Sequence, residues 1–156
     1  MSVAPQDVSP ALPPARVLAV LNPVMRVLLR TPAGRFVPGL ALLEFRGRRT
    51  GRRYRVPVGL HEVDGISYVV TPARWRANFV GGEPAELRNR GRVRPVVGTL
   101  VRDPDAVAAL IRRIIADGTR PAMIGIRMPA GHEVVAEDVA AIDRCAISFG
   151  ADPHRA

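Results

Sequence analysis

The stretch at residues 42–58 constrains the fold of this chain most strongly, because it joins two strand-like runs through one short basic turn. In the runs at 41–46 and 53–60, apolar residues recur at every second position, which is the period of a β-strand with one buried face. Gly47 and Gly51 lie in the turn between them. The pattern predicts a β-hairpin with a glycine-containing tip.

The tip of this hairpin has the residue types of a phosphate site. Six arginines lie within ten residues: Arg46, Arg48, Arg49, Arg52, Arg53 and Arg55. Glycine tolerates positive φ, so successive N–H groups can point at an anion while guanidinium groups bind its oxygens in pairs. Basic runs are also common on exposed loops, and a solvated hairpin tip is the alternative interpretation.

The rest of the chain predicts further hairpins and a few helices. Strands are expected at 66–70, 85–89, 92–101 and 145–149, with the turns Asp64-Gly65 and Arg90-Gly91. A short helix should lie near 74–82, a longer one should begin after Asp103-Pro104 and end at Gly118, and another should span about 137–143. A last strand that returns to a meander of hairpins indicates a small closed or split barrel with helices on one side.

Residues 14–150 are expected to form one domain, between a disordered tail at 1–13 and a frayed tail at 151–156. Apolar residues at helical spacing within 14–30 predict two short helices or one kinked helix. Such helices would pack over the barrel or lie on a membrane surface. Pro57 predicts that its strand is at an edge, contains a bulge, or lies beside a ligand.

The formal net charge of +9 makes phosphates, carboxylates, nucleic acid and anionic lipid plausible partners. All 23 basic residues are arginine, which is typical of GC-rich genomes such as those of actinobacteria and weakens the evidence from each one. A second basic group is expected to face solvent: Arg88, Arg90, Arg92 and Arg94. The single Cys145 suits a reducing compartment, so we expect a cytoplasmic protein with peripheral membrane contact as an option.

Metal and hydrolytic chemistry find little support in the sequence. The three histidines, His61, His132 and His154, are far apart and have no cysteine or carboxylate at ligand spacing, so we expect no metal site. Gly-x-Ser-x-Gly, Walker and Gly-x-Gly-x-x-Gly motifs are absent. If the chain is an enzyme, a bound cofactor should carry the reaction.

Three motifs together resemble the deazaflavin-dependent nitroreductase family. They are Gly47-Arg48-Arg49-Thr50-Gly51, Arg55-Val56-Pro57-Val58 and Trp75-x-x-Asn78-Phe79. The first is similar to the family's Gly-Arg-Lys/Arg-Ser/Thr-Gly, and the third to its Trp-x-x-Asn-Leu. The resemblance covers about residues 22–101. It implies a mainly β fold with helices (α+β), a split β-barrel of about six strands with helices packed around it.

The resemblance also implies an activity and a set of ligand contacts. Family members use coenzyme F-420, a deazaflavin that donates a hydride, and this chain would transfer that hydride to a small hydrophobic acceptor. The residues implied in cofactor binding are Arg48, Arg49, Thr50, Gly51, Pro57, Val58, Thr71, Arg74, Trp75 and Asn78. The first four would hold the phosphate end, and Pro57 and Val58 would line the ring.

This chain departs from nitroreducing relatives in two places. Those relatives have a longer loop before the tryptophan, and Arg74 or Arg76 would have to replace its part in phosphate binding. They also have a tyrosine shortly after the strand proline, where this chain has Gly59. The departures favour quinone reduction over nitroreduction, because a stacked hydride acceptor needs few protein groups beyond a proton source.

The proton source and the partners stay open at this point. Tyr54, Tyr68 and Thr71 are the candidate hydroxyl groups. An FMN-binding or non-catalytic ligand carrier with the same barrel is the alternative function. A nucleic-acid-binding module is a second one, disfavoured because only 4% of the residues are aromatic and could stack on bases. Split barrels commonly pair through a sheet face, so a homodimer is an option.

Overall fold

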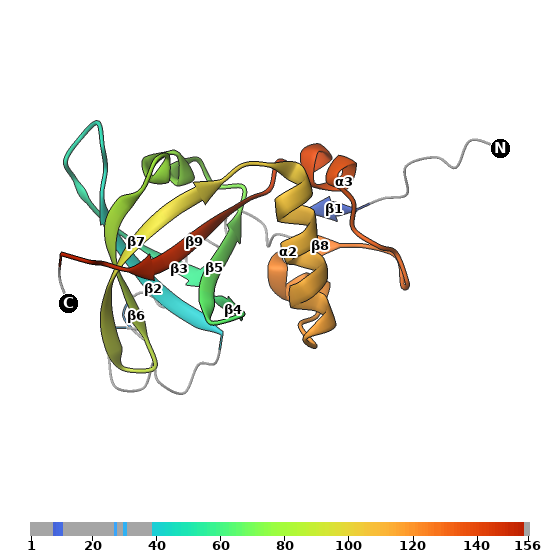
Figure 1. Ribbon diagram of the computed structural model, residues 1–156, viewed down its shortest axis with the longest axis horizontal. Coiled ribbons are helices and arrows are strands. Elements are labelled where there is room, and N and C mark those ends of the chain that lie inside the picture. Colours follow the sequence, from blue (N-terminus) through green and yellow to red (C-terminus); the bar gives the residue numbers. More distant parts are fainter. Residues whose placement is uncertain (1–7, 11–26, 28–29, 31–38, 155–156) are drawn as a thin grey trace.

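The computed structural model describes residues 8–10, 27, 30 and 39–154, and a curled antiparallel sheet is its main feature (Figure 1). The seven strands of this sheet follow the order β3-β2-β6-β7-β9-β5-β4. Their bounds are β2 (Leu40–Arg46), β3 (Arg53–Gly59), β4 (His61–Val63), β5 (Ile66–Thr71), β6 (Glu83–Asn89), β7 (Arg92–Val101) and β9 (Cys145–Ala151). A separate two-stranded sheet pairs β1 (Ser9–Pro10) with β8 (Ile126–Arg127).

Four helical segments accompany the strands within residues 39–154. They are η2 (Arg74–Phe79), α2 (Pro104–Ala116), η3 (Pro121–Ile124) and α3 (Ala136–Ala141). The helix α2 begins where expected, with Asp103 accepting a hydrogen bond from the Asp105 N–H and Pro104 in the first turn. Both α2 and α3 lie on one side of the barrel (Figure 1), as the sequence predicted. No helix in this part is long and apolar enough to cross a membrane.

The predicted two-residue turns are confirmed. Asp64 and Gly65 have φ values of 52° and 79°, and Arg90 and Gly91 have 51° and 76°. Positive φ at both central residues matches the right-handed twist of the strands that such turns connect. These turns set the register of β4 with β5 and of β6 with β7.

The fold contains two apolar cores, one on each face of the sheet. The barrel interior is filled by side chains of β2, β3, β5, β6, β7 and β9 together with Phe79 of η2, which is fully buried. The second core lies between the outer face of β5 and β9 and the helices α2 and α3, and it includes Ile111 and Ala146. Cys145 is 7% exposed, at the start of β9. Alternate residues of the same strand therefore serve different cores.

The observed strands differ from the predicted ones at several places. The sheet has seven strands instead of about six, because the run at 53–60 ends at Gly59 and a short β4 follows it. At the chain ends, β1 falls within the tail predicted at 1–13, and β9 continues to residue 151, one residue beyond the domain boundary predicted at 150. Asp152, in the tail predicted at 151–156, is buried. Pro57 lies in β3, a terminal strand of the sheet, as its missing N–H predicted. The helices predicted within 14–30 fall outside the described residues, apart from positions 27 and 30.

Acid should destabilise the α3 region through Asp138. This carboxylate accepts hydrogen bonds from the Val135 N–H (2.9 Å) and pairs with His132 (2.8 Å). Burial by itself raises the pKa of Asp138, but the Val135 and His132 hydrogen bonds and the His132 charge hold it below 3.8, its usual value. The stabilisation is thus complete above pH 3.8 and is lost as pH falls through the lower, folded pKa.

This pH dependence can be measured by urea unfolding between pH 5 and pH 2.5. The unfolding midpoint of the native chain should fall more steeply at the acid end than that of the Asp138→Asn variant. Glu137→Gln, at an exposed neighbouring position, serves as the control and should keep the native slope. If the unfolding midpoints of the native chain and of Asp138→Asn fell equally steeply with pH, the role assigned to Asp138 would be contradicted.

Candidate functional site

The tip of the β2–β3 hairpin forms a compact turn closed by glycine. The Gly47 N–H donates to the Arg52 carbonyl (2.8 Å) and the Gly51 N–H donates to the Gly47 carbonyl (2.9 Å). Gly51 has a φ of +65°, and a Cβ on Gly47 would lie 2.7 Å from the Tyr54 ring. Both glycines are therefore required by the local geometry, one by its backbone conformation and the other by the ring packed against it.

Arg48 ties this turn to η2 and to the loop that follows it. Its backbone N–H donates to Asn78 Oδ1 (2.9 Å), and the Asn78 amide in turn donates to the Trp75 carbonyl (2.7 Å). The Arg48 guanidinium donates to the Val80 carbonyl and pairs with Glu83 (3.4 Å). Its charge is thus engaged within the protein, so the Arg48 side chain has a positioning role.

The turn and η2 enclose a cavity of about 470 Å³ at this end of the barrel. It is lined by Gly47, Arg48, Arg49, Thr50, Tyr54, Arg74, Ala77 and Asn78. Among the described residues, the Arg49 and Arg74 side chains form no ion pair, and the N–H groups of Arg49 and Thr50 have no acceptor. Two unpaired guanidinium groups and two adjacent N–H groups are the donors that an oxyanion requires.

A second cavity of about 740 Å³ adjoins the first, since Tyr54 lines both and Trp75 follows Arg74 in the chain. Its described lining residues are Val27, Arg30, Arg53, Tyr54, Arg55, Val56 and Trp75. Tyr54 stacks on Phe45 with ring centroids 5.4 Å apart, and Trp75 contacts the same ring at 5.7 Å. The wall is thus made of aromatic side chains held by the barrel core.

Most of the residues predicted for the phosphate end come together around these cavities. Gly51 closes the turn, and Arg48, Arg49, Thr50, Arg74 and Asn78 line the smaller cavity. Arg76, the alternative to Arg74, is instead bound to the Asp143 carboxylate and carbonyl, both at 2.8 Å. Of these two arginines, only Arg74 lines the smaller cavity.

The two residues predicted to line the cofactor ring do not line the larger cavity. Val58 is 6% exposed and packs inside the barrel, and Val56 lines the larger cavity two residues earlier on the same strand face. Pro57 lies on the opposite face, where it is paired in register with Leu42. Sequence reasoning missed Val56 as a lining residue, although the strand alternation already placed it on the same face as Tyr54.

The three candidate hydroxyl groups lie in three different environments. Tyr54 is 38% exposed at the junction of the two cavities, with its hydroxyl 3.5 Å from Thr50 Oγ1. Tyr68 packs against the second core, on the outer face of β5. Thr71 is buried, and its hydroxyl accepts a hydrogen bond from the Ala73 N–H (3.1 Å). Only Tyr54 of the three is at the cavities.

The anchoring role of Arg48 predicts a loss of stability when its side chain is removed. Arg48→Ala should lower the free energy of unfolding by about 1–2 kcal/mol, because the hydrogen bonds to the Val80 carbonyl and Glu83 are lost. For a chain of this length that corresponds to a fall in melting temperature of about 3–6 °C. Arg49→Ala is the matched control, and its melting temperature should stay within about 2 °C of the native value. Equal melting temperatures for the two variants would contradict the positioning role assigned to the Arg48 side chain.

Searches for known relatives give a likeness of fold alone. No family model and no curated protein matches this sequence. A solved structure described as a domain-swapped dimer matches with a TM-score of 0.51 and 15% sequence identity, over 86% of this chain and 99% of that one. Together with the curled sheet, the likeness supports an α+β fold of the split-barrel kind. No group of three or more potential metal ligands occurs among the described residues.

Proposed function

We propose that this chain is an oxidoreductase that uses coenzyme F-420 to reduce a small hydrophobic acceptor such as a quinone. The observation that carries the proposal is the pair of adjoining cavities. In the described part of the chain, one is lined by two unpaired guanidinium groups and two free N–H groups, and the other by Val27, Tyr54, Val56 and Trp75 together with Arg30, Arg53 and Arg55. An amphipathic cofactor with a phosphate at one end and a ring system at the other fits this arrangement.

Each of the two cavities would bind a different part of the cofactor. Arg49 and Arg74, with the N–H groups of Arg49 and Thr50, would hold the phosphate. Trp75 and Val56 would provide the apolar wall of the ring site. The arginines at the rim of the larger cavity, Arg53 and Arg55, are paired with Glu44 at 3.6 and 3.5 Å, which leaves their positive charge partly balanced.

The bound cofactor would supply a hydride, and the chain would supply position and a proton. Tyr54 lies where both cavities meet, so its hydroxyl is placed to donate a proton to the oxygen of an acceptor stacked in the larger cavity. One hydride and one proton together convert a quinone to its hydroquinone, so Tyr54 supplies the single proton that the step needs, and solvent then reprotonates the tyrosine.

The Tyr54 assignment predicts a selective loss of turnover. Tyr54→Phe should lower kcat for quinone reduction by about 10- to 100-fold while the dissociation constant for F-420 changes less than about threefold, because only the proton donor is removed. Tyr68 packs against the second core, away from the two cavities, so Tyr68→Phe should leave kcat unchanged. Unaltered kcat in Tyr54→Phe would show that solvent delivers the proton.

Fluorescence titration of the purified chain with F-420 tests the cofactor directly, beside FMN and a short single-stranded oligonucleotide at moderate salt. Saturable binding of F-420 in the micromolar range or tighter, without binding of the other two, is the expected result. Binding of FMN alone would favour the flavin-binding or carrier alternative, and binding of the oligonucleotide alone would favour a nucleic-acid module.

We also propose that the chain forms a homodimer. The support is the solved structure of similar fold that is described as a domain-swapped dimer. Sedimentation velocity at micromolar concentration should give twice the mass of the 16.9 kDa chain. A single species at the mass of one chain would refute this pairing.

A further inference from the structure

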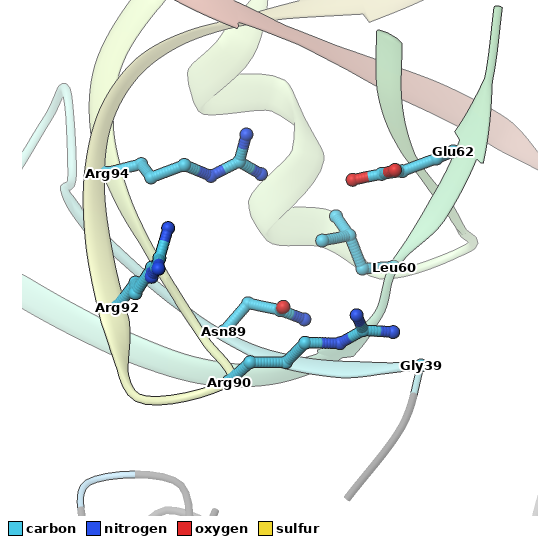
Figure 2. A pocket seen from close by; sticks show the side chains of 7 residues that line it. All are labelled: Gly39, Leu60, Glu62, Asn89, Arg90, Arg92 and Arg94. Atoms are coloured by element: carbon cyan, nitrogen blue, oxygen red, sulfur yellow. The ribbon is translucent and has the colours of Figure 1, made fainter. Parts of the chain in front are cut away.

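The end of the barrel opposite the hairpin tip contains a separate basic cavity of about 640 Å³ (Figure 2). Its described lining residues are Gly39, Leu60, Glu62, Asn89, Arg90, Arg92 and Arg94. The β2–β6 register, which pairs Phe45 with Ala85 and Leu42 with Arg88, places the β6–β7 turn at the far end from residues 47–52. This cavity is therefore distinct from the two cavities of the proposed cofactor site.

The inner face of β7 changes from apolar to basic towards this mouth. Val96 is buried in the barrel core, whereas Arg94 and Arg92 follow at the same two-residue spacing and line the cavity. Arg94 reaches inward to donate to Ser67 Oγ (3.3 Å), and Ser67 is only 4% exposed. The interior positions at this end thus carry polar groups where an ordinary barrel would be closed by apolar side chains.

These arginines were expected to face solvent, and the structure refines that expectation. Arg90, Arg92 and Arg94 are exposed, yet they are gathered on one side of a concave surface whose floor includes Leu60, 8% exposed. Within the described residues, the guanidinium groups of Arg90 and Arg92 have no hydrogen-bond or ion-pair partner. Asn89, by contrast, uses its amide to hold the Leu40 carbonyl (3.0 Å) and so fixes the rim.

One carboxylate faces the basic side. In Figure 2, Arg94 of β7 and Glu62 of β4 point toward one another across the opening. The three guanidinium groups exceed the single carboxylate, so the cavity keeps a positive balance and attracts anions. Guanidinium groups in a concave mouth bind phosphate or carboxylate oxygens in pairs, and barrel mouths are common ligand sites.

We propose that this barrel mouth binds a small organic anion, with its phosphate or carboxylate groups on Arg92 and Arg94. Glu62 repels the charge of the same ligand, so a natural ligand directs an uncharged hydrogen-bond donor, such as a hydroxyl group, toward that side. The volume accommodates a molecule of metabolite size. This site is independent of the proposed F-420 site and stands if that proposal fails.

Isothermal titration calorimetry at moderate salt, with pyrophosphate and citrate as probes, tests the site. The titrations use the full chain carrying Arg49→Gln and Arg74→Gln, so that anion binding at the hairpin turn does not contribute. Saturable binding of either probe supports the proposal, pyrophosphate indicating a phosphate ester and citrate a polycarboxylate as the ligand class. Absence of binding by both probes up to about 10 mM would overturn it.

Further substitutions of charged lining residues, added to the same variant, then test whether the anion binds in this cavity. Arg92→Gln with Arg94→Gln should raise the dissociation constant at least about tenfold, and Glu62→Gln should lower it about two- to fivefold. The matched controls are Arg102→Gln with Arg127→Gln, and Glu137→Gln, all at exposed positions that do not line this cavity. Equal changes in the controls would show diffuse attraction by net charge and refute the site. If loss of the Ser67 contact unfolds the double variant, Arg92→Gln alone carries the test.

Discussion

Replacing Arg49 and Arg74 together by glutamine should weaken F-420 binding about 100-fold, since each charge-assisted contact to a phosphate contributes about 1.5 kcal/mol, or about tenfold in affinity. The melting temperature should stay within about 2 °C of the native value, because neither guanidinium pairs with another described residue. Fluorescence titration gives the affinity, and differential scanning calorimetry gives the stability.

The control for this result is a second pair of exposed arginines. Arg102→Gln with Arg120→Gln removes the same charge far from the hairpin turn, and affinity for F-420 should fall less than about threefold. If both pairs weaken binding equally, long-range attraction accounts for the effect and the assigned contacts are wrong. If F-420 does not bind to the native chain at all, the cofactor proposal fails, whatever the variants do.

Replacing Phe79 by alanine should produce the largest loss of stability. Phe79 is fully buried and packs edge-on against Phe45 (5.1 Å), Trp75 (6.1 Å) and Phe149 (6.0 Å). Removing such a ring costs about 3–5 kcal/mol from lost burial and the cavity that remains. The melting temperature should therefore fall by about 10 °C.

Val80, the next residue in the chain, serves as the control position for Phe79→Ala. Val80→Ala, at a side chain that is 41% exposed, should change the free energy of unfolding by about 0.5 kcal/mol or less. Because Phe79 also supports Trp75, the Phe79→Ala variant should bind F-420 more weakly even at a temperature where it stays folded. A melting temperature within about 2 °C of the native one would show that η2 does not close the barrel core.

Much of the fold could be predicted because local rules decided it. The Asp64-Gly65 and Arg90-Gly91 turns require positive φ at both residues, and the flanking alternation then determines which side chains share a face. The helix α2 has a capping residue, a first-turn proline and a continuous apolar stripe. The break between β3 and β4 was missed, because the apolar alternation continues through Leu60 and a single glycine at position 59 is only a weak signal of a break.

The candidate site was predicted less completely than the fold. The motif residues of the turn and η2 do meet, but sequence could not distinguish Arg48, which is used to hold the loop, from Arg49, which is left unpaired. Likewise Arg74 and Arg76 look equivalent in the sequence, and only the position of Asp143 in space engages Arg76. Which of the strand residues face a cavity also depends on where the barrel interior ends, as Val56 and Val58 show.

Local patterns in the sequence by themselves determined where the longer strands, the two-residue turns and the capped helix α2 lie, because those features depend on residues close together in the chain. Tertiary structure alone decided which arginines are free to bind ligands. A guanidinium group becomes available or occupied according to carbonyl and carboxylate groups that lie 30 or more residues away, as Arg48 with Val80 and Arg76 with Asp143 demonstrate. It also placed Arg92 and Arg94 at a second mouth, because barrel closure converts one strand face into an interior.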